Sequence, residues 1–360
     1  MRVAHHGGNL AAIRRTQTVA PQQLLDFSAN INPLGLAPEL RQLLTAGLDE
    51  LTRYPDTTYL ALRQQLSQHF QVPVDWVFVG NGAVQLLFDV AATLAVKNVL
   101  LLAPAFAEYE RAFTRINAKI TYFDLAPAQQ FQIDVPALIA TLQQHPEIEA
   151  VCLGNPNNPT GQVLAREQMQ QLQSYCQQQH IWLLLDEAFM DFLPNEAAIS
   201  LVPSLQTDDQ VVIVRSATKF FAIPGLRLGY AIVPHVQLGQ RLLAFSEPWA
   251  LNSLAAIAGQ HIYQLTDYIQ ATEQWFAQEQ PWLQQQLAQI PQLTVFPSQV
   301  NYILLRAAPT DLAERLLQFG IVIRTCADYR QLDAHYYRVA VKDRAADQRL
   351  LVALKQVLSQ

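Results

Sequence analysis

Between residues 60 and 235, short apolar runs alternate with helix-like segments, and this pattern constrains the fold more than any other feature. Val, Ile and Leu on consecutive positions are typical of strands that are buried on both faces of a parallel sheet. The clearest runs are WVFV (76–79), VLLL (99–102), AVCL (150–153), IWLLL (181–185), VVIV (211–214) and LGYAIV (228–233). Segments such as 84–96 and 165–179 are suited to be crossover helices. The pattern therefore predicts an α/β domain with helices on both faces of its sheet.

The chain changes character near Pro248, and this change predicts a second, smaller domain. A long helix-like stretch, residues 252–290, is followed by short apolar runs that are typical of strands. Residues 1–40 contain Gly, Asn and Pro but too few apolar residues to form a core of their own. We expect a large domain over residues 41–247, a small α+β domain over 248–360, and an N-terminal arm, residues 1–40, that joins the small domain.

The composition restricts the possible partners and the compartment. The net charge is −6 and there is no Lys/Arg run, which argues against nucleic acid or an anionic membrane as partner. The longest apolar run, residues 99–107, is too short to cross a bilayer, and no apolar segment follows a basic start as in a signal peptide. The widely spaced Cys152, Cys176 and Cys326 argue against a disulfide framework or a zinc cluster. We therefore expect a cytoplasmic protein.

Glycine-rich, polar or charged segments directly follow four of the apolar runs. They are GNGA (80–83), GNPNNPTG (154–161), DEAF (186–189) and SATKFFAIPGLRLGY (216–230). In an open α/β sheet, ligands bind in the crevice beyond the carboxyl ends of the strands. The four segments are therefore predicted to contribute to one site.

The GNGA segment precedes a predicted helix, and its backbone N–H groups would suit a phosphate at the positive end of that helix. A plain strand-to-helix turn would explain this segment equally well if it stood alone. Gln85 occupies the position of the third glycine in a dinucleotide-binding fingerprint, so an NAD-dependent dehydrogenase is disfavoured.

Asp186 and Lys219 each follow an apolar run and together indicate a cofactor. An unpaired carboxylate at the end of run 181–185 would be costly, so Asp186 is expected to face a cation. Lys219 precedes Phe220 and Phe221, which would partly desolvate its amine. A helix cap and a surface lysine are the ordinary explanations for each residue taken alone. Together, an acid that can protonate a pyridine nitrogen and a desolvated lysine are the groups that hold pyridoxal phosphate as a Schiff base.

Two other classes of protein fit the sequence less well. A metal hydrolase could use Asp186, Glu187 and Asp191, but no histidine stands at ligand spacing beside them, so no metal is expected. A regulator that binds pyridoxal phosphate without catalysis would need a DNA-binding module, for which the chain has no basic patch.

Three motifs, in this order, resemble those of fold-type I pyridoxal phosphate enzymes of the class I/II aminotransferase superfamily. They are NPNNPTG (155–161), the run that ends in Asp186, and S-x-x-K-x-x-x-x-P-G-x-R-x-G-Y (216–230). The resemblance extends over nearly the whole chain and implies a large, mostly parallel sheet of seven strands. It also implies that Lys219 binds the cofactor covalently, that Asp186 pairs with the pyridine nitrogen N1, and that Asn158 bonds the phenolic oxygen.

The same resemblance implies further contacts with pyridoxal phosphate. The cofactor phosphate would be held by the side chains of Ser216 and Arg227 and by the backbone amides of Gly82, Ala83 and Val84. Phe106 would stack on the cofactor ring. Tyr54, in the segment RYPD, would reach the cofactor phosphate of a neighbouring subunit, which implies a homodimer with shared sites.

Within the superfamily, the chain is similar to two families whose substrates carry a phosphate monoester. These are the histidinol-phosphate aminotransferases and the L-threonine-O-3-phosphate decarboxylases of cobalamin biosynthesis. Both need cations beyond those that hold the cofactor, and Arg324 and Arg338 are expected to supply them. Arg338 matches the carboxylate-binding arginine of the superfamily, and Asn158 is expected to contact the substrate as well as the cofactor.

Three features favour the decarboxylases. The segment HHGGN (5–9) resembles their N-terminal arm, in which His6 and Gly7 would close over the substrate phosphate. The sequence around Asn32, DFSANINPLG, is also closer to that of the decarboxylases, and Asn32 is expected near the substrate carboxylate. Phe189 stands where many aminotransferases have a tyrosine. We therefore predict a small phosphorylated amino-acid substrate, L-threonine O-3-phosphate, that is converted to (R)-1-aminopropan-2-yl phosphate and CO₂; histidinol-phosphate amino transfer is the alternative.

Overall fold

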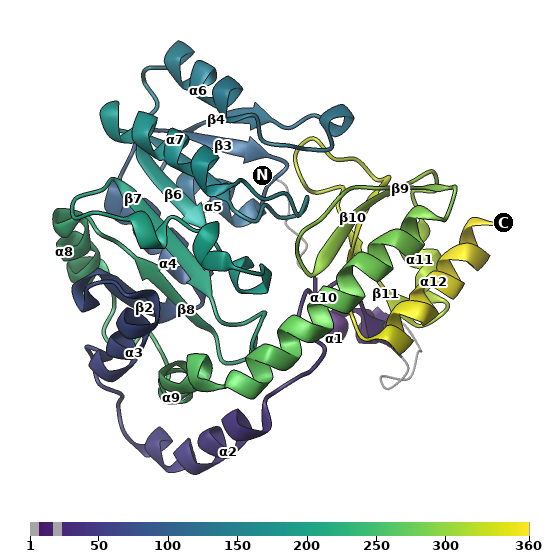
Figure 1. The fold of residues 1–360 in the computed structure, drawn as a ribbon, viewed down its shortest axis with the longest axis horizontal. Coiled ribbons are helices and arrows are strands. Elements are labelled where there is room, and N and C mark those ends of the chain that lie inside the picture. Colours follow the sequence, from purple (N-terminus) through teal and green to yellow (C-terminus); the bar gives the residue numbers. More distant parts are fainter. Residues whose placement is uncertain (1–6, 17–23, 360) are drawn as a thin grey trace.

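A seven-stranded sheet forms the centre of the larger part of the molecule (Figure 1). In the computed structural model, which describes residues 7–16 and 24–359, the strands follow the spatial order β2-β8-β7-β6-β5-β3-β4. Their bounds are β2 (Val77–Asn81), β3 (Asn98–Ala103), β4 (Lys119–Asp124), β5 (Ala150–Gly154), β6 (Trp182–Asp186), β7 (Val211–Ser216) and β8 (Leu228–Ile232). Strand β8 is antiparallel to both of its neighbours, β2 and β7, and the other neighbouring pairs of this sheet are parallel. The predicted large, mostly parallel α/β sheet is confirmed.

Helices cover both faces of this sheet because its strands are apolar on both sides. Leu100 and Leu102 of β3 share a core with α3, α6 and α7, whereas Val99 and Leu101 pack with α4, α5 and α8. The helices are α3 (Leu60–Phe70), α4 (Ala83–Leu94), α5 (Ala107–Arg115), α6 (Val135–Gln144), α7 (Arg166–Gln178) and α8 (Val236–Phe245). Among the described residues, none of the helices combines the length and the apolar character needed to cross a membrane.

Strand β4 was not among the apolar runs identified in the sequence. It lies at the edge of the sheet and pairs only with β3. Its side chains are only partly buried, so its sequence KITYFD lacks the continuous apolar run of the central strands. An edge strand therefore escapes a prediction that rests on burial of both faces.

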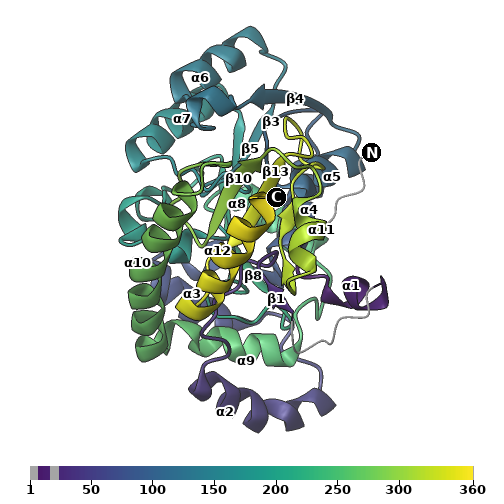
Figure 2. The same ribbon diagram turned by 90° about the vertical axis from the view of Figure 1, so that its right-hand side faces the viewer.

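A four-stranded antiparallel sheet forms the smaller domain, with the order β12-β13-β10-β9. The strands are β9 (Leu293–Val295), β10 (Tyr302–Ala307), β12 (Arg324–Thr325) and β13 (Tyr336–Ala340). Three helices accompany them, α10 (Thr266–Ala288), α11 (Leu312–Leu317) and α12 (Arg344–Leu358). Figure 2 shows α10 and α12 side by side, and their apolar faces share one core with β10 and β13.

The N-terminal arm contains α1 (Leu10–Thr16) and β1 (Leu25–Asp26). Strand β1 pairs in parallel with β11 (Ile321–Val322), so this part of the arm lies against the small domain. The arm then continues to α2 (Pro38–Ala46), which packs against α9 (Ser253–His261).

The region after residue 248 divides differently from the prediction of one long helix in the small domain. The structure has α9, a short 3-10 helix and then α10. Helix α9 and the residues just before it pack with the large domain: Tyr59 OH donates to the Leu251 carbonyl at 2.9 Å, and Ala255 and Ala258 of α9 share a core with Leu62. Helix α9 therefore packs against α3 and contributes to the core of the large sheet. The 3-10 helices are η2 (Gly47–Thr52), η3 (Val74–Trp76), η4 (Pro127–Gln129), η5 (Met190–Phe192), η6 (Glu196–Ala198), η7 (Val202–Ser204) and η8 (Ile262–Gln264).

Candidate active site

A cavity of about 530 Å³ lies beyond the carboxyl ends of the large sheet, where the arm and both domains meet. Ala83, Asn158, Asp186 and Lys219 line it, so each of the four strand-end segments contributes a residue. The parallel order of β5, β6 and β7 brings these strand ends together. The small domain adds Arg324, Tyr329 and Arg338, and the arm adds Gly7 and Gly8 together with residues 28–31.

The start of α4, at one end of the cavity, has the features of an anion-binding site. Gly82 precedes the helix with φ +81°, and no side chain caps the first backbone N–H groups. A Cβ on Gly82 would lie 2.5 Å from Nη2 of Arg227, and a Cβ on Gly229 would lie 2.2 Å from the Ala83 nitrogen. The two glycines therefore let β8, the guanidinium and the helix start approach closely. Open N–H groups beside an arginine suit a phosphate.

The loop after β7 places three polar side chains next to this anion site. Oγ of Ser216 and Oγ1 of Thr218 are 2.7 Å apart, and Nζ of Lys219 donates to Thr218 Oγ1 at 3.1 Å. Burial lowers the pKa of Lys219 to about 8, with the positive charges of Arg227 and Arg338 acting in the same direction and Asp186 opposing them. Lys219 is therefore partly neutral near physiological pH, as a nucleophilic amine must be.

Asp186 is held by two hydrogen bonds at the end of β6. Tyr109 OH donates to Oδ2 at 2.8 Å, and the Ala188 backbone N–H donates to Oδ1 at 2.9 Å. Burial raises the pKa of Asp186, while both hydrogen bonds and the charge of Lys219 lower it. The carboxylate is thus fixed in orientation and can compete for a proton.

Tyr109 was missed in the sequence, although one signal could have found it. It lies three residues after Phe106, and both residues line the cavity from the first turn of α5. Their rings meet edge to face with centroids 5.7 Å apart. An aromatic residue at i+3 from a predicted stacking residue lies on the same side of a helix, so it is a natural neighbour of the cofactor ring.

The two predicted substrate arginines differ in their partners. Arg324 forms an ion pair with Asp328 at 2.7 Å. Arg338 donates instead to neutral oxygens, Oδ1 of Asn158 at 2.5 Å and the Ser28 carbonyl at 3.1 Å. Its buried Nε has no hydrogen-bond partner among the described residues. Arg338 therefore keeps an uncompensated charge and a free donor for an anionic ligand.

Asn158 receives a second hydrogen bond from the small domain. Tyr329 OH donates to its Oδ1 at 3.2 Å, next to the bond from Arg338. The amide nitrogen of Asn158 makes no hydrogen bond within the described parts of the chain, which leaves it available for a ligand oxygen. Phe189 also lines the cavity and packs edge to face on Tyr302, with centroids 4.8 Å apart.

The arm closes one side of the cavity through Ser28. The Gly8 backbone N–H donates to Ser28 Oγ at 2.9 Å, and Ser28 Oγ in turn donates to Asp26 at 2.6 Å. A Cβ on Gly7 would lie only 2.0 Å from the Ser28 carbonyl oxygen, so only glycine fits there. His6 lies outside the described residues.

Three predicted site residues among those described, Gly82, Asn32 and Tyr54, do not line the cavity, although Gly82 directly precedes Ala83, which does. Asn32 is buried and donates to the Phe220 carbonyl and to Thr272 Oγ1, both at 2.8 Å. Its side chain thus supports the backbone next to Lys219, and its expected contact with substrate has no counterpart in the structure. Tyr54 is 80% exposed and its ring lies tilted against Trp249 with centroids 4.6 Å apart, and it is not among the residues that line the cavity of its own chain.

The described residues fit pyridoxal phosphate. The uncapped start of α4 with Arg227 and Ser216 can hold the phosphate, and Lys219 supplies the amine. Asp186, fixed from behind by Tyr109, supplies the carboxylate that the pyridine nitrogen needs. Fold and site together define a pyridoxal phosphate-dependent enzyme of fold type I.

Comparison with known proteins identifies the family. The model of aminotransferase class I and II matches residues 22–354, and the chain belongs to this family. It is 41% identical to the threonine-phosphate decarboxylase of Salmonella typhimurium over 98% of this chain and 96% of that protein. It is 28% identical to an adenosylcobalamin biosynthesis bifunctional protein of Leptospira interrogans, over 99% of this chain and 41% of that longer protein. The crystal structure of the histidinol-phosphate aminotransferase of Clostridium acetobutylicum superposes with a TM-score of 0.87 at 29% identity, over 93% of this chain and 99% of that one.

Proposed function

We propose that the chain is a pyridoxal phosphate-dependent decarboxylase that converts L-threonine O-3-phosphate to (R)-1-aminopropan-2-yl phosphate and CO₂ in cobalamin biosynthesis. The observation that carries this proposal is the similarity, over nearly the full length of both chains, to a threonine-phosphate decarboxylase. The sequence identity to a histidinol-phosphate aminotransferase is lower, at 29%, and amino transfer is the second candidate.

Bound pyridoxal phosphate supplies the electron sink that takes up the electron pair left on Cα when CO₂ departs. Asp186 holds a proton at the pyridine nitrogen N1, and Tyr109 keeps the carboxylate in place for this task. Lys219 would attach the cofactor through its neutral amine, and in its protonated form it would be the acid that returns a proton to Cα. Its pKa of about 8 suits both duties near neutral pH.

The substrate carries two anionic groups that need cations besides those at the cofactor phosphate. Arg338 is suited to the carboxylate, since it has no carboxylate partner of its own among the described residues. Arg324, with Gly7 and His6 of the arm, is suited to the phosphate. Decarboxylation requires the bond from Cα to the carboxylate to stand perpendicular to the cofactor ring, and holding both anionic groups would fix that angle.

A homodimer with shared sites is the proposed assembly. Leu48, Leu51, Tyr54 and Trp249 are large apolar side chains that are 45–80% exposed, which favours a protein partner. Tyr54 would then contact the cofactor phosphate of the second subunit. Mixing a Lys219→Ala variant with a Tyr54→Phe variant should restore activity through sites free of both changes; no recovery, with Tyr54→Phe alone impaired, would refute sharing. The free, buried thiols of Cys152, Cys176 and Cys326 support a cytoplasmic location.

The reaction is tested with the purified protein and added pyridoxal phosphate. L-Threonine phosphate should release CO₂ without a keto acid, and the product should keep its amine and its phosphate. Unphosphorylated threonine and a Lys219→Ala variant are the controls, and both should release little CO₂. Efficient formation of glutamate from histidinol phosphate and 2-oxoglutarate, with no CO₂ from threonine phosphate, would establish the aminotransferase instead.

A further inference from the structure

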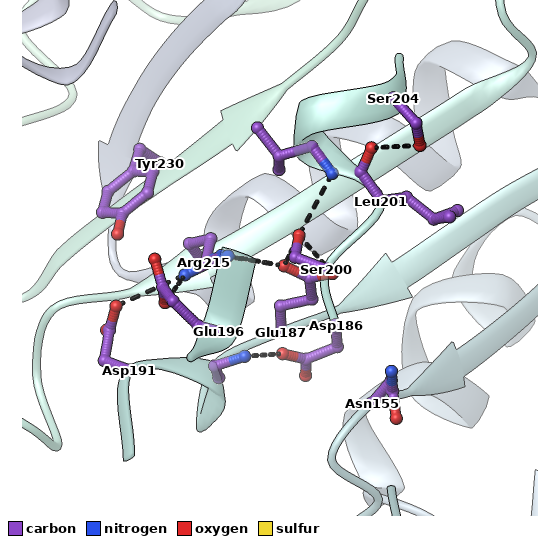
Figure 3. A network of polar contacts seen from close by, with 12 residues as sticks. Asn155, Asp186, Glu187, Asp191, Glu196, Ser200, Leu201, Ser204, Arg215 and Tyr230 are labelled. Carbon is purple, nitrogen blue, oxygen red and sulfur yellow. Dashed lines mark hydrogen bonds and ion pairs between the residues drawn. The ribbon is translucent and has the colours of Figure 1, made fainter. Parts of the chain in front are cut away.

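One buried arginine, Arg215, binds three carboxylates close to the cofactor site (Figure 3). Its Nε and Nη2 lie 2.9 and 2.8 Å from Oε2 of Glu187. Its Nη1 lies 2.8 Å from Glu196 and 3.3 Å from Asp191. The side chains of Arg215 and Glu187 are each only 1% exposed. None of these four residues lines the cavity, so the proposed function leaves the cluster unexplained.

The cluster lies directly behind the two strand ends that carry the cofactor residues. Arg215 precedes Ser216 at the end of β7, and Glu187 follows Asp186 at the end of β6. The strands are held together here, since the Glu187 backbone N–H donates to the Val214 carbonyl at 2.8 Å. Successive side chains of a strand point to opposite sides. Asp186 and Ser216 therefore face the cavity while Glu187 and Arg215 meet on the other side.

The carboxylates also fix the segment that leads away from Asp186. Asp191 lies in η5 and Glu196 in η6, and both reach back to Arg215. Between Asp186 and η5, Ala188 and Phe189 line the cavity. Ala188 also supplies one of the two hydrogen bonds to Asp186. The position of this segment thus determines the shape of the cavity wall.

We infer that Arg215 is a positioning residue: its guanidinium clamps the segment after Asp186 to the strand end before Lys219, and so sets the distance between the two cofactor-binding groups. The inference rests on the proposed pyridoxal phosphate site. A lysine at this position keeps one charge but lacks the planar fork that contacts Glu187, Asp191 and Glu196 together.

The charges of the cluster explain why the clamp depends on this one side chain. Three carboxylates face a single guanidinium, and Tyr263 OH donates to Asp191 at 3.2 Å. Burial and the charge of Glu196 raise the pKa of Asp191 to about 7, so this carboxyl carries a proton part of the time near neutrality. Without the guanidinium, buried carboxylates would repel one another and the segment would move.

The experiment compares Arg215→Lys and Arg215→Gln with the parent protein. The dissociation constant for pyridoxal phosphate is measured by titrating cofactor-free protein, together with the visible absorbance of the bound cofactor, kcat and KM. We expect at least a tenfold loss of cofactor affinity and of kcat in both variants. The KM for threonine phosphate should change less than threefold, because the substrate arginines lie elsewhere.

Arg344→Gln is the control for losing an arginine–carboxylate pair away from the cofactor site, since Arg344, whose side chain is 44% exposed, makes two bonds to Glu279 at 2.8 and 3.1 Å in the small domain. It should lower the stability to urea and leave cofactor affinity within twofold. Arg215→Lys protein that loses stability but keeps parental cofactor affinity and kcat would overturn the inference. If the Arg215 variants do not fold, Glu196→Gln, at a partly exposed position, serves instead. This variant should bind pyridoxal phosphate about threefold more weakly than the parent. An unchanged cofactor affinity in Glu196→Gln would also overturn the inference. A parent protein that does not bind pyridoxal phosphate would refute the proposed function itself.

Discussion

Replacing Tyr109 with phenylalanine should slow the proposed decarboxylation, because the change removes one of the two hydrogen bonds that Asp186 receives. The lost bond runs from Tyr109 OH to Asp186 Oδ2 at 2.8 Å, and the bond from the Ala188 backbone remains at 2.9 Å. Tyr109 is only 2% exposed, so solvent cannot readily supply a substitute donor. The phenyl ring keeps the packing against Phe106.

The size of the effect follows from the charge of the acceptor. A hydrogen bond to a charged group is worth about 1.5–3 kcal/mol, and about 1.4 kcal/mol corresponds to a tenfold change in rate. Loss of the bond raises the pKa of Asp186 beyond the increase that burial already causes, because the hydrogen bond from Tyr109 opposes that increase. Asp186 then competes more strongly for the proton that it should leave on the pyridine nitrogen. We expect kcat to fall by about 10- to 100-fold.

The assay is CO₂ release from L-threonine phosphate at saturating substrate, measured from pH 6 to pH 9. Tyr175→Phe on α7 is the matched control, since the Tyr175 hydroxyl makes no hydrogen bond within the described parts of the chain. The control should keep the parental kcat. A Tyr109→Phe protein with kcat within twofold of the parent and an unchanged pH profile would refute this account of Asp186.

Four further outcomes are expected. Because burial lowers the pKa of Lys219 to about 8, the rate at which cofactor-free protein binds pyridoxal phosphate should rise from pH 7 to pH 9. A rate that does not vary with pH, measured by stopped-flow absorbance, would contradict the role of Lys219 as the amine that binds the cofactor. Gly229→Ala should weaken cofactor binding at least tenfold in an equilibrium titration, since its Cβ would lie 2.2 Å from the backbone nitrogen of Ala83. Gly225→Ala is the control; its Cβ would meet no atom within 4 Å, and the variant should bind pyridoxal phosphate as the parent does. Gly7→Ala places a Cβ 2.0 Å from the Ser28 carbonyl oxygen and should displace the arm. The KM for threonine phosphate should then rise about tenfold, which corresponds to the loss of about one hydrogen bond to the phosphate. An equal rise in the KM for unphosphorylated threonine would argue against a role of the arm in phosphate binding. Burial raises the pKa of Asp191 to about 7, against 3.8 ordinarily, so the stability that its proton contributes is present at pH 4 and lost as the pH rises through 7. The free energy of unfolding in urea should fall over this interval, and Asp191→Asn should reduce the fall; an unchanged slope in the variant would disprove the shift.

The central strands could be predicted because their chemistry is local. Each of the six apolar runs between residues 60 and 235 overlaps a strand of the large sheet, and those at 99–102 and 150–153 lie wholly within one. The edge strand β4 could not be predicted in this way, because its half-buried residues, Lys119–Asp124, form no continuous apolar run. The break between α9 and α10 also has no strong local signal, because α9 is placed by its contact with α3 rather than by its own sequence.

The residues of the candidate site also include some that the sequence could predict and some that it could not. Asp186 and Lys219 were expected at the cofactor because each stands at the end of an apolar run, and Arg227 because its motif resembles that of the superfamily; all three line the cavity. Asn32, which stands in a comparable motif, turns out to be buried against Thr272. A motif can indicate that a residue is near a site, but the direction of its side chain depends on which distant element packs against it.

The sequence by itself determined the class of fold and the kind of cofactor, since both depend on patterns within short segments: apolar runs, strand-end residues and the spacing of Asp186 and Lys219. Only the tertiary structure decided how these groups are held. The bond from Tyr109 to Asp186 joins α5 to β6, and the clamp of Arg215 joins β7 to the segment after β6. Such contacts are set by the order of strands and the packing of helices across the whole chain, and no local pattern contains that information.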